Sequence, residues 1–433
     1  MSDEWATSAN ECIKLSLVDP ETQKNVVSFN PAMTYQIFDE AESIYGYKGL
    51  KVDLKFACDD LTPCITASWK EKIDAEGDAA AQDPVEILKE HLPEDVYTSE
   101  SEWKAALKSR TEPFTPPGTC IHTYTHSGTT FSIYRTSLPT ALCKTVLNNI
   151  QITTELLIEG GSQIPVEDED WSDARWDVYF LYTSLPTSTK HSLVGYVTFY
   201  NFFTYLPGYD YSSHPETHHS RTRLSQFVIL PPYQRQGHGS VLYDTVYAQY
   251  LADPSVLEIT VEDPNEAFDI LRYARDLPRL RKAKELPVDL TPSKVREAAR
   301  TKPETSNGLL VTPSTFLSAL RKELKLPERH FLQLLELHLL SVLNGIPKGG
   351  SKEARKTRED EERAYRLLIK ERIYRQNKDS LAELEESERK EKLQETYESV
   401  VEGYREVLEG LKPKRREREE EEDGGARKKV KRG

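Results

Sequence analysis

The chain has 433 residues, enough for two or three domains, each with a sizeable hydrophobic core. Its 57 Lys and Arg residues stand against 71 Asp and Glu residues, so the net charge is −14 and we expect no direct binding of nucleic acid. The acidic N-terminus predicts no secretory signal, and no apolar run approaches the length that spans a membrane.

The five cysteines are scattered without a C-x-x-C pair, which predicts reduced thiols, as in the cytosol or nucleus, rather than a disulfide framework. Two H-x-x-x-H spacings occur, at His122/His126 and at His214/His218. Neither has a cysteine pair to complete a structural zinc site, so we interpret them as surface or strand histidines and predict no metal.

The first part of the chain, residues 10–112, is predicted to be a small mixed α/β domain. Alternating apolar positions predict strands at 12–18 and 50–56, with a turn at 44–49 between periodic segments. Residues 71–84 are rich in Ala, Asp and Gly and are predicted to be a loop or a disordered insert.

A second domain is expected over residues 113–280. Its first helix is predicted at 138–150, and an acidic loop follows at 166–171. The apolar face of that helix is expected to hold Ala141, Leu142, Val146 and Ile150.

The next elements follow the order strand–strand–strand–helix–strand–helix, which predicts a mixed sheet with one parallel helical crossover. One helix is expected to end near Leu251 and the other to begin at Pro264. The strands are predicted at 176–183, 193–204, 222–230 and 255–262. Together these patterns predict an α+β fold.

Three segments follow, namely a helical domain at 281–345, a charged helical extension at 346–411 and a disordered basic tail at 412–433. In the extension, Glu and Lys or Arg recur at i,i+4 spacing. It could be a solvated helix or could dock on a partner, and we favour the solvated helix because apolar positions are sparse. The tail holds two basic clusters, which fit nuclear import better than simple solubility.

The most informative segment is the glycine-rich turn Gln234–Ser240, which follows the apolar strand 227–230. Gly237 and Gly239 lack the Cβ atoms that would block a positive φ or a close approach to the backbone. The N-terminus of the following helix would then offer free N–H groups to a pyrophosphate. The spacing differs from the P-loop and dinucleotide motifs, and a Gly-x-Gly turn alone also occurs without a ligand.

A second segment runs from a strand into a helix over residues 256–268. Asp263 could be the N-cap of that helix, with Pro264 at N1 and Glu266 at N3. Glu262 ends the strand next to the glycine turn, where α/β sheets open to ligands. We expect its carboxylate to be partly desolvated, which would raise its pKa and let it accept a proton.

The glycine turn resembles the Q/R-x-x-G-x-G/A signature of the GNAT superfamily of N-acetyltransferases, in which such a turn holds the pyrophosphate of acetyl-CoA. Together with 261–268, it is similar to the catalytic subunit of the type B histone acetyltransferases. Supporting matches are Tyr45–Leu50, Val194–Tyr196, Tyr200–Phe202 and Ser225–Gln226. The resemblance covers roughly residues 10–345, in the order and spacing of that family.

The resemblance implies acetyl transfer from acetyl-CoA to lysine ε-amines in the N-terminal tail of newly made histone four, by direct attack in a ternary complex. It implies Glu262 as general base, with Glu159 and Asp263 as further active-site carboxylates. It places the cofactor on Phe227, Val228, Ile229, Gln234, Arg235, Gln236, Gly237, His238, Gly239, Ser240, Asn265 and Phe268. It places the histone on Glu40, Glu42, Tyr200, Asn201 and Phe202.

Three of these positions or their neighbours, namely Arg235, His238 and Ala41, have open or divergent interpretations. Arg235 could contact phosphate or face solvent, and we expect His238 to shape the turn or lie on the surface rather than to catalyse. Ala41 stands where the family has an acid, so the acidic patch around it is weaker here.

The resemblance also implies a WD-repeat propeller histone chaperone as partner subunit, roles in chromatin assembly and DNA repair, and location in nucleus and cytoplasm. Two alternatives are a GNAT acetyltransferase acting on another protein or a polyamine, and a non-catalytic histone chaperone. A chaperone of that kind would be expected to lack either Glu262 or the glycine turn, and this chain has both.

Overall fold

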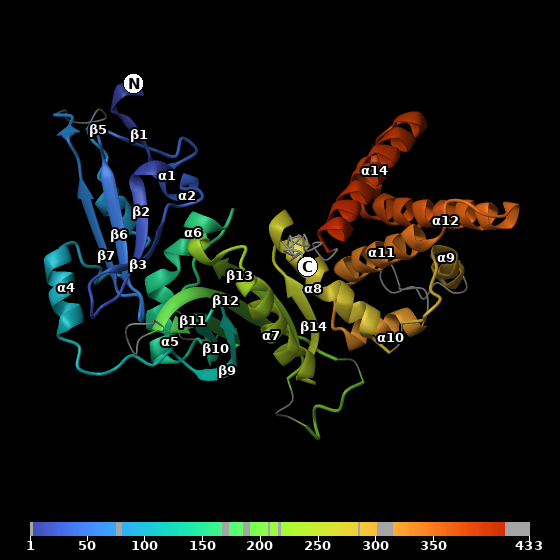
Figure 1. The fold of residues 1–433 in the computed structure, drawn as a ribbon, viewed down its shortest axis with the longest axis horizontal. Coiled ribbons are helices and arrows are strands. Elements are labelled where there is room, and N and C mark those ends of the chain that lie inside the picture. The colour runs from blue at the N-terminus through green and yellow to red at the C-terminus, as the bar shows by residue number, and fades with distance from the viewer. Residues whose placement is uncertain are drawn as a thin grey trace, which may run out of the picture. The chain divides into compact units, whose positions relative to one another are not determined.

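The computed structural model describes residues 3–74, 80–166, 173–184, 191–206, 208–214, 218–284, 286–300 and 315–411. The chain divides into two compact units, of which one comprises residues 1–271 with 319–331 and the other comprises 272–318 with 332–433 (Figure 1). The predicted acidic loop lies largely outside the described residues, and the basic tail lies wholly outside them. The architecture is α+β, as predicted.

The first unit begins with a mixed sheet in the order β3-β2-β6-β7. Its two central strands, β2 (Ile13–Val18) and β6 (Lys51–Ala57), run parallel and confirm the strands predicted there. The outer strands β3 (Asn25–Phe29) and β7 (Pro63–Ser68) pair antiparallel with them.

Short elements surround this sheet. They are α1 (Ala9–Cys12), α2 (Tyr35–Phe38), α3 (Pro84–Lys89), α4 (Glu100–Lys108) and the paired short strands β1 (Ala6–Ser8) with β4 (Ser43–Tyr45) and β5 (Tyr47–Lys48) with β8 (Glu71–Lys72). The prediction of a loop over 71–84 is therefore wrong at its start, because residues 71–72 pair with the segment after Gly46.

The larger sheet has the order β14-β13-β12-β11-β10-β9, and only β13 and β14 are parallel (Figure 1). This confirms the predicted mixed sheet with one helical crossover, which is α7 (His238–Ala252). The hairpin of the first two strands was not predicted. The strands are β9 (Thr119–His126), β10 (Thr129–Ser137), β11 (Trp176–Ser184), β12 (His191–Phe203), β13 (Ser220–Ile229) and β14 (Val256–Val261).

Helices α5 (Ala141–Ile150) and α6 (Ile152–Leu157) pack between the two sheets. The predicted apolar face of α5 is partly wrong. Val146 and Ile150 are buried as expected, but Leu142 is 39% exposed and Cys143 is buried in its place. The helix begins at Ala141, later than predicted, and the facing sheets decide which side is covered.

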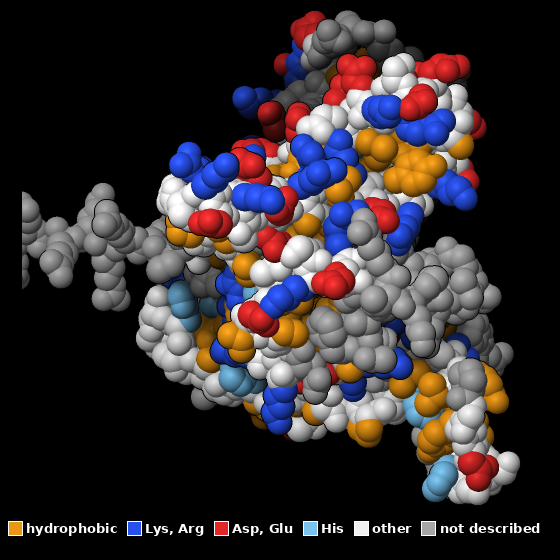
Figure 2. All heavy atoms as spheres, turned by 90° about the vertical axis from the view of Figure 1, so that its right-hand side faces the viewer, with side chains coloured by type: hydrophobic (Ala, Val, Ile, Leu, Met, Phe, Trp, Pro, Cys, Tyr) orange, Lys and Arg blue, Asp and Glu red, His pale blue; other side chains and the backbone are white. Residues whose placement is uncertain are grey.

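The second unit is helical and contains α8 (Glu266–Lys282) from residue 272 onward. The remaining helices are α9 (Pro292–Arg300), α10 (Thr315–Glu323), which crosses the unit boundary, α11 (Glu328–Gly345), α12 (Lys352–Gln376), α13 (Lys378–Ala382) and α14 (Glu386–Gly410). Figure 2 shows acidic and basic side chains interspersed over these helices.

The preference for a solvated extension over 346–411 is wrong. Buried Glu336 of α11 accepts two hydrogen bonds from Arg372 of α12, at 2.7 and 2.8 Å, and one from Tyr404 of α14 at 2.9 Å. The few apolar residues of α12 and α14 are spaced three or four apart, so they share one face and pack. Tyr365 and Ile369 belong to that face.

Four of the five cysteines are buried, and Cys120 is exposed on β9. None of the helices in the described parts of the chain is long and apolar enough to cross a membrane. Across those same parts, no group of three or more His, Cys, Asp or Glu side chains is placed to hold a metal ion.

Candidate active site

The candidate site begins at an irregularity in β13. Thr198 of β12 pairs with Gln226 and Phe199 pairs with Leu224, so Ser225 is the extra residue of a β-bulge. On the other edge, the pairing with β14 ends at Leu224, whose carbonyl accepts a hydrogen bond from the N–H of Glu262 at 2.9 Å. A bulge bends its strand, so the two parallel strands separate beyond this point.

Beyond the bulge, no strand of the described chain pairs with one edge of β13. The N–H of Leu230 donates to the carbonyl of Val194, on the β12 side, at 2.9 Å. Because backbone groups alternate along a strand, Ile229 and Phe227 turn theirs to the opposite edge. An extended arm with amide groups can add to such an edge as a strand does. The binding of acetyl-CoA by residues 227–229 stays a prediction.

The glycine turn lies at the end of this edge. Gly237 is the N-cap of α7 with φ +90°, where glycine is favoured, and a Cβ there would meet no atom of the described chain within 4 Å. The side chains of Gln234 and Gln236 donate back to the carbonyls of Ile229 and Pro232, each at 2.8 Å, and so shape the turn. Arg235 is exposed. The space beside Gly237, at the N-terminus of α7, is therefore open in the described chain.

His238 shapes the turn from inside, as expected. It begins α7, is 1% exposed, and its Nδ1 is 2.7 Å from the hydroxyl of Tyr124 on β9. Its ring centre is 4.3 Å from that of Phe131 on β10. Burial, aided by the nearby His126, lowers the pKa of His238 below its ordinary value of 6.5. A buried imidazole thus joins the hairpin to the turn.

The start of α8 corrects one prediction. The N-cap is Asn265, whose Oδ1 accepts from the N–H of Phe268 at 2.9 Å, and not Asp263. Asp263 has φ +30° and lies before the helix, so it is free of the capping role. The ring of Phe268 lies 4.9 Å from that of Phe227 on β13, beside the free edge.

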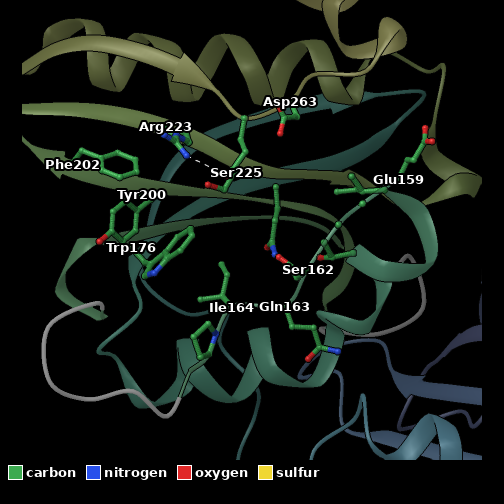
Figure 3. Close-up of a pocket in the computed structure, with 17 residues that line it drawn as sticks. Glu159, Ser162, Gln163, Ile164, Trp176, Tyr200, Phe202, Arg223, Ser225 and Asp263 are labelled. Atoms are coloured by element: carbon green, nitrogen blue, oxygen red, sulfur yellow. Dashed lines mark hydrogen bonds and ion pairs between the residues drawn. The ribbon is translucent and has the colours of Figure 1, made fainter. Parts of the chain in front are cut away.

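A cavity of about 500 Å³ opens where β13 and β14 separate (Figure 3). The three carboxylates expected at the active site, Glu262, Asp263 and Glu159, all line it, as does Ser225 of the bulge. Glu159 follows α6 and lies at the end of the cavity away from Tyr200 and its aromatic neighbours in Figure 3. The fold thus brings together residues that are about a hundred positions apart in sequence.

The expected environment of Glu262 is not what the structure shows. Its side chain is 45% exposed, and its carboxylate forms an ion pair of 3.2 Å with Arg223 of β13. We expected a partly desolvated carboxylate because Glu262 lies at the end of a strand. The structure shows an exposed, ion-paired carboxylate instead. The cation that pairs with Glu262 is Arg223 on the neighbouring strand β13, and periodicity within one strand did not predict that the two side chains meet.

One wall of the cavity is aromatic. Trp176 and Tyr200 have ring centres 4.9 Å apart, and Tyr200 and Phe202 are 4.6 Å apart. Asn201 lies between them in sequence, so alternation turns it to the other face, where it bonds to Asp177 and Thr222 at 3.0 and 2.7 Å. The expected contact of Asn201 with substrate is therefore not supported.

Sequence reasoning missed Trp176 and Arg223. Both pair directly with Tyr200, on β11 and β13 respectively, so the strand register puts them on the same face as this predicted residue. Alternation within each strand shows which residues share a face. It does not give the register between neighbouring strands, which is needed to place Trp176 and Arg223 beside Tyr200.

Gln226 fixes the bulge to the floor of the cavity. Its side chain, 5% exposed, donates to the carbonyl of Ser162 at 2.7 Å and accepts from the Thr198 hydroxyl at 3.2 Å. The backbone N–H of Gln226 also donates to that hydroxyl. These bonds tie the loop after α6 to β12 and β13.

The expected histone-binding acids lie by a smaller cavity of about 380 Å³, lined by Glu40, Glu42, Tyr35 and also Glu159. Glu40 is exposed. The carboxylate of Glu42 instead accepts from the N–H groups of Thr34 and Tyr35 at the start of α2, at 2.6 and 3.2 Å. Glu42 therefore has a structural role, and Glu40 is the more available acid.

Comparisons with known proteins match both halves of this arrangement. A family described as the N-terminus of the histone acetyl transferase HAT1 matches residues 5–159, and the acetyltransferase (GNAT) family matches residues 150–268. A histone acetyltransferase type B catalytic subunit from Aspergillus fumigatus is 36% identical, over 93% of this chain and 77% of that protein. Namesakes from Aspergillus oryzae and Candida albicans are 34% and 33% identical, over 94% and 95% of this chain and 86% and 91% of theirs.

The chain belongs to the family of type B histone acetyltransferase catalytic subunits. Its central sheet is a GNAT domain, and GNAT acetyltransferases use acetyl-CoA as the acetyl donor. A solved aminoglycoside acetyltransferase from a soil metagenome is 20% identical over 37% of this chain and 93% of that chain, but a TM-score of 0.22 supports no inference.

His238 predicts a pH dependence of stability. Its pKa is lowered in the folded protein, so between that value and 6.5 the unfolded chain binds more protons and stability falls as pH decreases. We expect His238→Gln to reduce the loss of unfolding free energy between about pH 7.5 and about pH 5.5. Urea unfolding at both pH values measures the change in unfolding free energy of each protein.

The matched control is His122→Gln, which alters an exposed histidine of the same hairpin and should leave the pH slope as in the wild type. Equal slopes for His238→Gln and the wild type would contradict the assignment.

Proposed function

We propose that this protein transfers acetyl from acetyl-CoA to lysine ε-amines in the N-terminal tail of newly made histone four. The observation that carries the proposal is that Glu262, Asp263 and Glu159 line one cavity, and that this cavity opens at the bulge where the free edge of β13 begins. The donor's extended arm would lie along that edge, and its pyrophosphate would lie at the N-terminus of α7.

Glu262 is the proposed general base. An amine must be uncharged to attack a thioester, yet the reference pKa of lysine is about 10.4. A carboxylate at the cavity can attract the ammonium and then accept its proton. Glu262 is placed for this role because its side chain lines the cavity. Its backbone N–H bonds to Leu224, the last residue of β13 that pairs with β14.

The proposed chemistry is direct attack within a ternary complex. The amine nitrogen, uncharged once the ammonium has given one proton to Glu262, bonds to the thioester carbonyl carbon. The carbon–sulfur bond then breaks to release the CoA thiolate, which takes up the second proton lost by that nitrogen. A backbone N–H on the free edge of β13 would stabilise the oxyanion. The described cavity lining contains no cysteine, which is consistent with a route without an acyl-enzyme.

The proposed histone tail would follow the acidic side chains. Glu159 lines both the catalytic cavity and the smaller cavity with Glu40 and Glu42. A cationic tail is attracted by a path of carboxylates leading to the reacting lysine. The aromatic wall of Tyr200 and Phe202 would enclose the aliphatic part of that lysine.

Substitution of the base tests the mechanism. Glu262→Gln should lower kcat by ~10²–10⁴, the usual loss for a missing general base, with acetyl-CoA affinity little changed. Steady-state assays and calorimetric titration of acetyl-CoA measure both. Glu258→Gln is the matched control, because Glu258 lies on β14, the strand that Glu262 directly follows, and also pairs with an arginine, Arg221. An unchanged rate for Glu262→Gln would remove it from this role.

The acceptor is tested separately. Purified protein with acetyl-CoA should acetylate a peptide of the histone four tail in preference to spermidine. Preferred acetylation of spermidine would instead support the alternative, a GNAT acetyltransferase with a polyamine acceptor.

We further propose a WD-repeat propeller histone chaperone as partner, and a distribution between nucleus and cytoplasm that serves chromatin assembly and DNA repair. The basic clusters of residues 412–433 support the nuclear part. Deleting these residues should reduce nuclear accumulation of a tagged protein, and undiminished accumulation would contradict their role. Co-purification with a WD-repeat subunit tests the partner.

A further inference from the structure

A second cavity, of about 510 Å³, adjoins the first. The two share Phe202, Arg223, Glu262 and Asp263 in their linings. The side chain of Arg223 therefore lies where the cavities meet, and Figure 3 shows it beside Phe202. Its other neighbour is the proposed base, Glu262.

Arg223 is held on two sides. Its guanidinium lies over the ring of Phe202, 4.4 Å from the ring centre, and Phe202 in turn packs against Tyr200. On its other side, Nη1 is 3.2 Å from Oε1 of Glu262. The aromatic contact restricts the arginine, because a cation over an aromatic ring is attracted to its face.

Glu262 has fewer constraints of its own. Its side chain is long and 45% exposed, and across the described chain the only side chain bonded to it is Arg223. An unrestrained glutamate would lose rotamer freedom only on binding substrate. The arginine fixes the carboxylate beforehand, at the wall shared by the two cavities.

We infer that Arg223 is a positioning residue, which holds Glu262 ready to receive the acceptor amine and is itself held by Phe202. This rests on the proposed function, since it assumes that Glu262 is the base. A fixed cation beside the acceptor site also disfavours an ammonium ion relative to the uncharged amine. Both effects favour the reactive pair of carboxylate and neutral lysine.

A neighbouring ion pair provides a matched control. Arg221 lies two residues earlier on the same face of β13 and pairs with Glu258 at 2.6 Å. Glu258 also contacts Arg321 at 3.5 Å, so this pair connects β13, β14 and α10. Neither Arg221 nor Glu258 lines the cavity with Glu159 and Ser225.

The first experiment measures single substitutions. Arg223→Gln should lower kcat about tenfold, because a displaced catalytic group loses effective alignment, while KM for acetyl-CoA changes less than about twofold. Arg223→Lys keeps the charge without the planar fork and should recover part of the loss. Arg221→Gln should retain wild-type kcat. Wild-type kcat in both Arg223 variants would overturn the inference.

The second experiment asks whether Arg223 acts through Glu262. In the Glu262→Gln background, Arg223→Gln should cause no further loss of kcat, because there is no carboxylate left to position. A second tenfold loss in the double variant would show that Arg223 acts independently, and would overturn the inference.

The kcat values of these variants also distinguish a failure of the proposed base from a failure of the positioning role. Full activity of Glu262→Gln contradicts the proposed base, whatever Arg223 does. A large loss in Glu262→Gln together with full activity of Arg223→Gln and Arg223→Lys contradicts only the positioning role. Thermal unfolding of each variant shows whether it is folded, and Arg223→Lys provides the test if Arg223→Gln is not.

Discussion

The bulge at Ser225 is the constraint on which the site depends. Strand β14 pairs with β13 up to its last residue, Val261, which lies opposite Leu224, and the bulge begins at the next residue of β13. The extra residue ends that pairing at Leu224, so the next backbone groups face an opening instead of a strand. The same separation places the end of β14, with Glu262, at the mouth of the cavity.

Buried polar groups hold this irregularity in place. Gln226 bonds to both Thr198 and Ser162, so moving the bulge would leave buried polar atoms without partners. The loop that carries Ser162 also carries Glu159, and its Gly160 N–H donates to the hydroxyl of Tyr35 at 2.8 Å. One network thus connects β12 and β13, the loop of Glu159 and Ser162, and helix α2.

Much of the fold could be predicted from the sequence because its signals are local. Sequence patterns located β2 and β6 of the first sheet and β11 to β14 of the second, and the glycine spacing located the turn before α7. The hairpin at 119–137 escaped because its residues are mostly Thr, His and Tyr, without an apolar face that stands out. Packing of α12 and α14 escaped because sparse apolar residues become a face only when helical spacing aligns them.

The site residues that the family resemblance named could be predicted from the sequence. The contacts that depend on the register between neighbouring strands could not. The three carboxylates meet in one cavity as expected. The bulge and the pair of Arg223 with Glu262 depend on how strands align with each other, which periodicity within one strand does not specify. The position of Asn201 on the face opposite Tyr200 follows from alternation within β12. The N-cap moved from Asp263 to Asn265 for a similar reason, since both residues suit the position and only the path of the chain selects one.

Hydrogen–deuterium exchange at single-amide resolution tests the central claim, that the acetyl donor occupies the edge of β13 freed by the bulge. Addition of acetyl-CoA should slow exchange at the amides of Phe227 and Ile229 and at the first amides of α7, while amides of β9 remain unchanged. Unaltered exchange at Phe227 and Ile229 with the site saturated would place the donor elsewhere and contradict the account.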